Sequence, residues 1–227
     1  MADSGYENLQ VDIKLASRVA VNHPWINGDG LVEYLCAVEE YGRDYLELVS
    51  KSVVDGPSDL DTDVPLEHTG GVAHASVSFF DCTEKYVDKF YKRYDEKYAP
   101  YVDSRKTKIP KSGGEFKSSI FKQPFYPARE CTFYFRGDAD RIAELFEYLP
   151  HLGAKGTCGY GAIDDINART IERDMSLVHD GVAMRPIPAE KLSHAERTEW
   201  LSWKAPYWAD ENHTECAPPG VGVEAEW

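Results

Sequence analysis

The sequence lacks the features that would assign it to several common classes of protein. It contains no run of about 18 apolar residues, so we expect no transmembrane helix and no membrane partner. Its first eight residues are polar and acidic, so we expect no secretory signal. Its five cysteines are widely spread and form no CxxC pair, which argues against a disulfide framework and a structural zinc site. This cysteine usage fits the reducing cytoplasm best.

Catalytic patterns are also scarce. None of the seven histidines pairs as HxxxH or HExxH, and no Ser-His-Asp or paired-carboxylate pattern can be read. We therefore expect no metal, no cofactor and no catalytic residue. The alternative that stays open is ribonuclease activity, in which His23 or His151 would act as a general acid or base.

Positive charge is scarce overall but concentrated in one segment. The net charge is −14, which is unusual for a protein that binds nucleic acid, because Lys and Arg neutralise phosphates. Between Arg105 and Arg129, however, seven basic residues stand against the single acid Glu115. This asymmetry is typical of an interaction segment, although an ordinary solvated loop explains it equally well. The seven candidates for contact with RNA are Arg105, Lys106, Lys108, Lys111, Lys117, Lys122 and Arg129.

Hydrophobic periodicity predicts a mixture of strands and helices. Apolar residues at helical spacing predict helices that begin at Asp29 and at Asp138, which are the expected N-caps, and Gly42 is expected to end the first one. A third helix is predicted over 84–98. Alternation of apolar and polar residues predicts strands over 9–15, 73–79, 131–136 and 163–171, with a further candidate strand over 45–54.

The order of these elements is close to the βαββαβ pattern and predicts an α+β, ferredoxin-like (RRM-like) fold. We expect one domain over 1–175, with an inserted helical and basic segment at about 82–128. The C-terminal extension over 176–227 is expected to pack on the same domain. From residue 193 it is rich in Trp and shows no regular strand pattern, so an irregular tail is predicted. Such a Trp cluster is more often a packing lid than a stacking platform.

Four glycines crowd the loop over 153–161, which follows the helix that begins at Asp138. A Rossmann loop would follow a strand and open a helix, and a Walker loop would contain Gly-Lys-Ser/Thr, so neither motif is present. The glycines would let backbone N–H groups approach a phosphate or a base. The alternative is a flexible turn with Gly153 as the C′ residue of the helix and Tyr160 packed in the core. The RNA-binding candidates are Lys155, Gly156, Gly159, Gly161 and Tyr160, which could stack on an unpaired base.

Several segments together resemble one known family. They are 112–117 (SGGEFK), 123–128 (QPFYPA), the glycine loop, 176–181 (SLVHDG), 184–188 (MRPIP), 29–35 (DGLVEYL) and 205–208 (APYW). This series resembles the Cas-five-like subunit of type IV CRISPR effector complexes, a branch of the RAMP superfamily. The segments at 112–117 and 184–188 discriminate best, because a glycine loop is common to all RAMP proteins.

The resemblance implies a ferredoxin-like RAMP fold and binding to the 5′ handle of CRISPR RNA (crRNA). It also implies contact with the neighbouring backbone subunit and with other effector subunits, and it adds Arg185 to the RNA-binding candidates. Our hypothesis from the sequence is a non-catalytic, cytoplasmic crRNA-binding subunit of a ribonucleoprotein complex for antiviral or anti-plasmid defence. Two alternatives stay open: a RAMP endoribonuclease that processes precursor crRNA, and a purely structural scaffold subunit.

Overall fold

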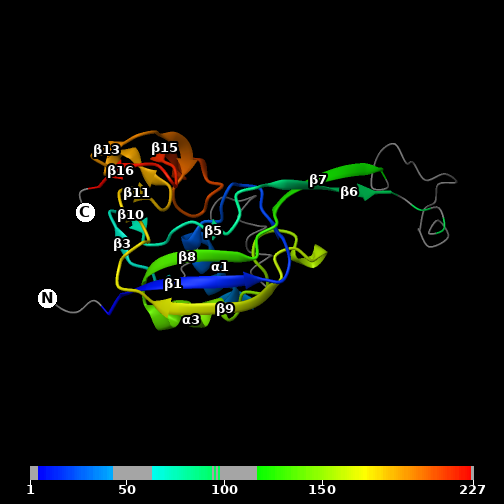
Figure 1. Ribbon diagram of the computed structural model, residues 1–227, viewed down its shortest axis with the longest axis horizontal. Helices are drawn as coiled ribbons and strands as arrows, with labels where there is room; N and C mark the ends of the chain where they lie inside the picture. The colour runs from blue at the N-terminus through cyan, green and yellow to red at the C-terminus, as the bar shows by residue number, and fades with distance from the viewer. Residues whose placement is uncertain (1–4, 43–62, 94, 96, 98–116, 226–227) are drawn as a thin grey trace.

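The computed structural model describes residues 5–42, 63–93, 95, 97 and 117–225, which form a mixed α/β fold made mostly of strands (Figure 1). The α-helices of the described part are α1 (Gly28–Tyr41) and α3 (Ala139–Phe146). The longer strands are β1 (Glu7–Leu15), β6 (Tyr86–Lys92), β7 (Ser119–Tyr126), β8 (Glu130–Gly137), β9 (Ile163–Thr170), β14 (Glu199–Ser202) and β15 (His213–Ala217). The two-residue strands are β2 (Val19–Ala20), β3 (His68–Thr69), β4 (Val72–Ala73), β5 (Phe79–Phe80), β10 (Val178–His179), β11 (Val182–Ala183), β12 (Ile187–Pro188), β13 (His194–Ala195) and β16 (Val223–Glu224).

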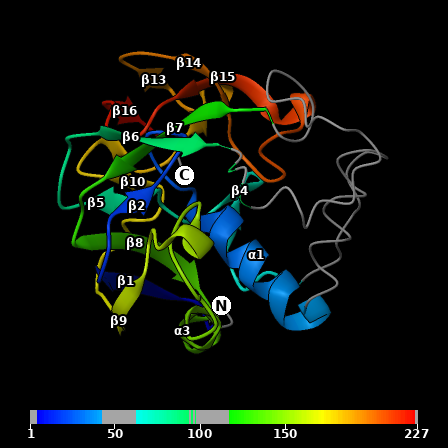
Figure 2. The ribbon, with the colours of Figure 1, turned by 90° about the vertical axis from the view of Figure 1, so that its right-hand side faces the viewer.

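The main sheet is antiparallel and has the strand order β5-β8-β1-β9. Along β1, Val11 and Ile13 are fully buried while the residues between them are partly exposed, which is the period of two expected for a sheet with one covered face. Both helices pack on that face, and Leu35 of α1 and Ile142 of α3 join the same core (Figure 2). The predicted strands over 9–15, 131–136 and 163–171 correspond to β1, β8 and β9.

The two helix starts differ from each other in how they are capped. Asp138 caps α3 as predicted, because its side chain accepts a hydrogen bond of 3.0 Å from the backbone N–H of Arg141. The N-cap of α1 is Asn27 and not Asp29, which lies inside the first turn and is buried. The guanidinium of Arg185, in the C-terminal part of the chain, donates a hydrogen bond to Asp29. No local sequence pattern predicts this contact. Gly42 ends α1 as predicted.

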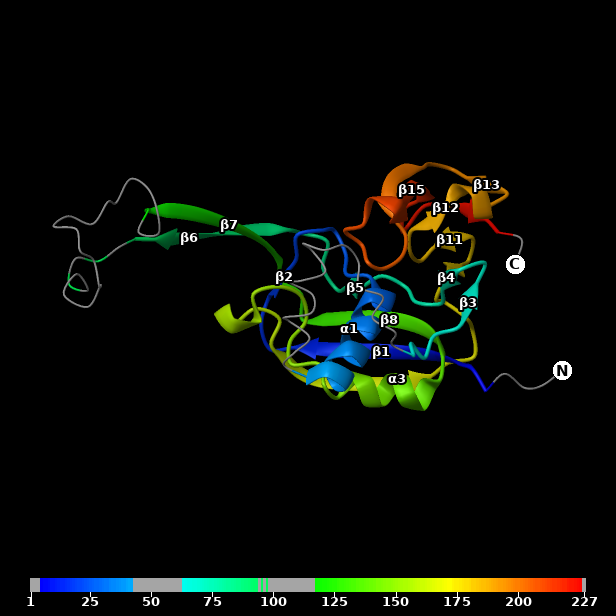
Figure 3. The ribbon, with the colours of Figure 1, turned by 180° about the vertical axis from the view of Figure 1, so that it is seen from behind.

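The predicted helix over 84–98 is wrong for residues 86–92, because β6 occupies them and pairs with β7 as an antiparallel hairpin. Val, Phe and Tyr at helical spacing are also the residues that favour strands, and the cross-strand partner decides between the two. The described part of the inserted segment is therefore a pair of strands and not a helix. It projects away from the main sheet, as seen at the right of Figure 1 and at the left of Figure 3.

The other predicted strands have mixed outcomes. The one over 73–79 is split between β4 and β5, with single bridges at Ala75 and Val77 between them. The candidate strand over 45–54 lies outside the described residues. No helix among the described residues has the length and apolar character needed to cross a membrane.

The C-terminal part is not the irregular tail that we predicted. It contains the sheet β12-β15-β14 and the pairs β10-β11 and β13-β16, around a small core with Ile187 and Ala217 at its centre. These strands are short, and apolar and polar residues alternate poorly along them. They are therefore strands because of the segments they pair with and not because of their own sequence pattern. The part packs on the preceding residues, since the N–H of Val77 donates to the carbonyl of Met184 at 2.9 Å.

Candidate nucleic-acid interface

One face of the β6–β7 hairpin carries an opposed pair of lysines and no acid, while the other face carries Asp88 and most of the aromatic rings. Residues directly opposite each other on antiparallel strands share a face, and the register pairs Lys89 with Lys122 and Tyr91 with Ile120. We call this side the basic face. Its members are Val87, Lys89 and Tyr91 of β6 and Ile120, Lys122 and Pro124 of β7, flanked by Lys85 and Arg93. None of these eight residues is acidic.

The basic face combines cations with exposed apolar groups. Val87, Tyr91 and Ile120 are 54%, 57% and 60% exposed, which is unusual for side chains of this size. The Cζ of Arg93 lies 5.5 Å from the centre of the Tyr91 ring, within the range of a cation–π contact. Cations beside an exposed aromatic ring, here that of Tyr91, are used to bind single-stranded nucleic acid, in which the cations meet phosphates and the ring stacks on a base.

Lys89 and Lys122 are directly opposed across the two strands, and both are exposed. Like charges in such a pair destabilise a sheet, because their Cβ atoms lie only about 4.5–5.5 Å apart. A bound anion would remove this repulsion. The pair is therefore a suitable place for a phosphate group.

The glycine loop adjoins the root of the hairpin. The N–H groups of Ala154 and Gly161 donate to the carbonyl oxygens of Ala20 and Arg18, each at 2.8 Å. Ala20 belongs to β2, which pairs with β7, so the loop is attached to the hairpin sheet β2-β7-β6.

Two glycines of the loop are required by close approach of the backbone. A Cβ on Gly161 would lie 1.8 Å from the carbonyl oxygen of Leu152, and a Cβ on Gly153 would lie 2.6 Å from that of Ala20. Gly159, in contrast, has open space around it and a φ of +84°. Gly153 and Gly161 thus hold the loop against the protein, and Gly159 lies at its exposed part.

Lys155 is the basic residue of this loop, and its backbone is strained. Its φ is +62°, in the left-handed region that costs a residue with a side chain about 1–2 kcal/mol. Its side chain is exposed. Strain of this kind persists where the surrounding structure fixes it and is frequent at binding sites.

Two of the predicted RNA-binding side chains are buried, so the sequence assignment is corrected for both. Tyr160 is 2% exposed, and its hydroxyl donates to Asp88 while burial and this hydrogen bond raise its pKa. Its ring packs against Phe90 and Phe125 and cannot stack on a base in this arrangement. Arg185 is 1% exposed, and its guanidinium is paired with Asp29 inside the protein. Neither side chain reaches the surface because partners from distant segments enclose it.

The other predicted residues are distributed over the surface. Lys117 and Lys122 are exposed on or next to β7, and Arg129 is exposed immediately before β8. Gly156 is partly buried against the ring of His151, which a Cβ would meet at 2.3 Å. Four basic candidates lie outside the described residues: Arg105, Lys106, Lys108 and Lys111.

Sequence reasoning missed Lys85, Lys89 and Arg93, which the structure places on or beside the basic face. They were missed because the basic candidates were sought in the charged segment between Arg105 and Arg129, and these three residues precede it. Their shared odd numbering with Val87 and Tyr91 is the period-two signal that would have found them.

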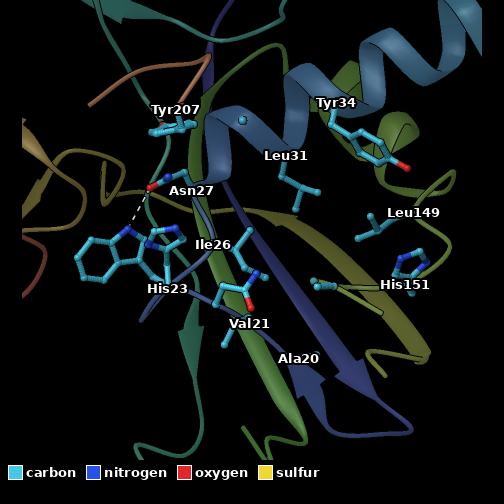
Figure 4. Close-up of a pocket in the computed structure, with 15 residues that line it drawn as sticks. Ala20, Val21, His23, Ile26, Asn27, Leu31, Tyr34, Leu149, His151 and Tyr207 are labelled. Carbon is cyan, nitrogen blue, oxygen red and sulfur yellow. Dashed lines mark hydrogen bonds between the residues drawn. The ribbon is translucent and has the colours of Figure 1, made fainter. Parts of the chain in front are cut away.

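A cavity of about 540 Å³ lies beside the glycine loop (Figure 4). Its wall includes Leu31 and Tyr34 of α1, Tyr207 from the C-terminal part, and both His23 and His151 (Figure 4). The side chain of Asn27 accepts a hydrogen bond of 3.1 Å from the indole N–H of Trp25 at its edge. The volume lies within the range of sites for small organic molecules and is large enough for one nucleotide.

Comparison with known proteins gives a match to one family and a weak likeness to solved structures. No curated protein matches the sequence. The structure described as "Cryo-EM structure of the Type III-B Cmr-beta bound to cognate target RNA" contains a chain with 12% sequence identity and a TM-score of 0.40. The likeness covers 73% of this chain and 61% of that chain, so this protein spans less than two thirds of it.

The family described as "CRISPR type IV associated protein Csf3" matches residues 73–219, which is more than half of the 227-residue chain. This match confirms the link to type IV CRISPR systems that the sequence segments indicated, while the Cas-five-like assignment stays a prediction. The chain belongs to the family of CRISPR type IV associated protein Csf3.

Proposed function

We propose that this protein is a non-catalytic subunit of a type IV CRISPR effector complex and that it holds the 5′ handle of crRNA. Membership of a type IV CRISPR family supports the first part. The observation that carries the second part is the basic face of the hairpin, where an opposed lysine pair lies among exposed apolar side chains. The same proposal places the protein in the cytoplasm and in contact with neighbouring effector subunits.

The topology supports a ferredoxin-like RAMP fold for this subunit. The chain runs through β1, α1, β5, β8, α3 and β9, and the sheet order is β5-β8-β1-β9. This is a strand, helix, strand, strand, helix, strand path with both helices on one face, as the split βαβ arrangement requires.

The three surface features can act on one RNA strand. The basic face would neutralise phosphates and stack on bases, and Lys155 would add one charge at the loop. The cavity, next to Gly153 and Ala154, would take one unpaired base. The acidic remainder of the chain would confine RNA to this side, since phosphates are repelled elsewhere.

The test is binding of the purified protein to RNA of its own CRISPR repeat. We expect binding that weakens with salt, and loss of affinity when Lys89 and Lys122 are replaced by Ala. Replacement of Lys14, an exposed lysine on β1, is the matched control and should change little. A protein that assembles with its partner subunits but neither copurifies with RNA nor binds it would instead be a structural scaffold.

A processing endoribonuclease is the second candidate, because His23 and His151 line the same cavity from different segments. Incubation of the protein with repeat RNA, followed by gel analysis, decides this point. We expect no cleavage. Cleavage that is abolished by His23→Ala or His151→Ala would establish the enzyme.

A further inference from the structure

The hairpin and the glycine loop meet at a small cluster that is separate from the main core. Its buried members are Ala20 of β2, Phe125 of β7 and Tyr160 of the loop. Tyr160 therefore extends from the loop into the root of the hairpin, where its ring lies 6.3 Å from that of Phe125 and 6.1 Å from that of Phe90.

A polar contact completes this junction. The carboxylate of Asp88, in β6, accepts the hydroxyl hydrogen of Tyr160 and lies 3.0 Å from Nη2 of Arg18. The Cζ of Arg18 also lies 4.7 Å from the centre of the Phe125 ring and 5.1 Å from that of Tyr160. One carboxylate thus links β6, the glycine loop and the residue that precedes β2.

We infer that Asp88, Tyr160 and Arg18 are positioning residues that fix the hairpin to the glycine loop, so that RNA contacts on the two elements act together. The inference rests on the proposed function, because it concerns the RNA that both elements would bind. Tyr160 and Asp88 are not expected to touch RNA, and the exposed guanidinium of Arg18 is engaged by Asp88 and by two aromatic rings. Tyr160 is buried, and Asp88 would repel phosphate if it were free of its partners.

The mechanical reason is the length of the hairpin. By the strand register, the basic face extends to Tyr91 and Ile120, five residues along each strand from the root pair Tyr86 and Phe125. The hairpin of β6 and β7 projects away from the rest of the protein (Figure 3). A small rotation at the root therefore moves the distal residues by a large amount. The paired backbone of β2 and β7 is short: it spans Val19 and Ala20, with one further bond of 3.3 Å from the N–H of Val21 to the carbonyl of Pro124. The side-chain junction adds contacts that resist that rotation.

The first measurement needs no RNA. Spin labels on Ser118→Cys, next to β7, and Asp140→Cys, in α3, report the distance between hairpin and body, with Cys82 and Cys158 replaced by Ser. We expect Tyr160→Phe and Asp88→Asn to broaden the distance distribution. Tyr126→Phe is the matched control, since it removes a hydroxyl that bonds to the carbonyl of Pro24 at the same root, and should leave the distribution narrow.

The second measurement is a double-mutant cycle on RNA binding with Lys122→Ala and Lys155→Ala. In the wild-type background, we expect the effect of the double substitution on the Kd for RNA to differ by about threefold or more from the product of the two single effects. In the Tyr160→Phe background, we expect the two effects on Kd to multiply independently. An unchanged distance distribution in both junction variants overturns the inference, and so does coupling that survives in Tyr160→Phe. If the wild type binds no RNA, the proposed function fails. The inference that the junction positions RNA contacts then fails as well, even if the spin labels show that the junction fixes the hairpin.

Discussion

Nη2 of Arg185 lies 2.9 Å from Oδ2 of Asp29, and both side chains are buried. The pair joins the first turn of α1 to the C-terminal part of the chain. The same guanidinium donates to the carbonyl oxygens of Ala73 and Trp203, each at 2.6 Å, so three distant segments converge on one side chain. The discriminating segment over 184–188 therefore contributes to the fold through Arg185.

Arg185→Met should destabilise the protein strongly. Removal of one partner leaves the carboxylate of Asp29 buried without its cation, which costs about 3–5 kcal/mol in comparable pairs. Urea denaturation gives the free energy of unfolding. Arg169→Met is the control, because Arg169 is exposed and lies 3.5 Å from Asp12, and it should cost less than about 1 kcal/mol. Equal losses for the two variants would contradict the role assigned to the buried pair.

Replacement of both Lys89 and Lys122 by Ala should weaken RNA binding without weakening the fold. Each lost phosphate contact lowers the slope of log K against log salt by about 0.7 for a single strand, so the slope should fall by roughly 1.4. Relief of the like-charge pair should raise the free energy of unfolding by a few tenths of a kcal/mol. Filter binding over a salt series and urea denaturation check the two effects, and an unchanged slope would remove the basic face from the RNA site.

Lys155→Gly separates strain from binding in the glycine loop. Gly tolerates a φ of +62°, so the variant should be as stable as the wild type or more stable by up to about 1 kcal/mol. RNA affinity should nevertheless fall, because one positive charge is lost. Thermal unfolding and RNA titration measure the two quantities. A variant that is both less stable and fully able to bind RNA would contradict this account of Lys155.

Gly159→Val alone does not separate loss of an RNA contact from backbone strain. The position is open, but its φ of +84° strains any β-branched residue, so a cost of about 1–2 kcal/mol is expected before RNA is considered. Gly159→Asn, which tolerates positive φ better, is the control for backbone strain. If Val and Asn at this position reduce RNA binding equally while only Val lowers the melting temperature, the loop contacts RNA.

The ionisation of Asp174 should make the free energy of unfolding depend on pH in the acidic range. Burial would raise the pKa of this carboxyl, but hydrogen bonds from His74 and Ser176 outweigh it and hold the pKa at about 2, below the ordinary 3.8. Because the folded pKa is the lower one, the carboxylate stabilises the fold above about pH 4, and this stabilisation is lost as the pH falls towards 2. The contribution at neutral pH is roughly 2 kcal/mol.

The check is urea denaturation of the wild type and Asp174→Asn at pH 6 and at pH 2.5. The variant should be less stable at pH 6, and the difference between the two proteins should shrink to roughly a third at pH 2.5. Asp165→Asn, at an exposed carboxylate 3.8 Å from Lys14, should show little of this behaviour. A difference between wild type and Asp174→Asn that is the same at both pH values would show that the ionisation of Asp174 is not responsible.

Local chemistry was enough to predict much of the main sheet and the starts of its helices from the sequence. The alternation over 9–15 gives β1, and Asp138 caps α3, because a strand face and a helix start depend mainly on neighbouring residues. The link to type IV CRISPR systems also came from short segments of the sequence, and the family match confirms it.

The hairpin and the burial of the candidate side chains were decided only by the tertiary structure. Val87, Phe90 and Tyr91 fit a helix as well as a strand, and pairing with β7, about 30 residues further along the chain, selects the strand. Tyr160 and Arg185 have the chemistry of RNA-binding residues, yet Asp88 and Asp29 withdraw them into the protein. Those partners lie 72 and 156 residues away in sequence, so no local pattern could place them, whereas the folded chain brings them within hydrogen-bond distance.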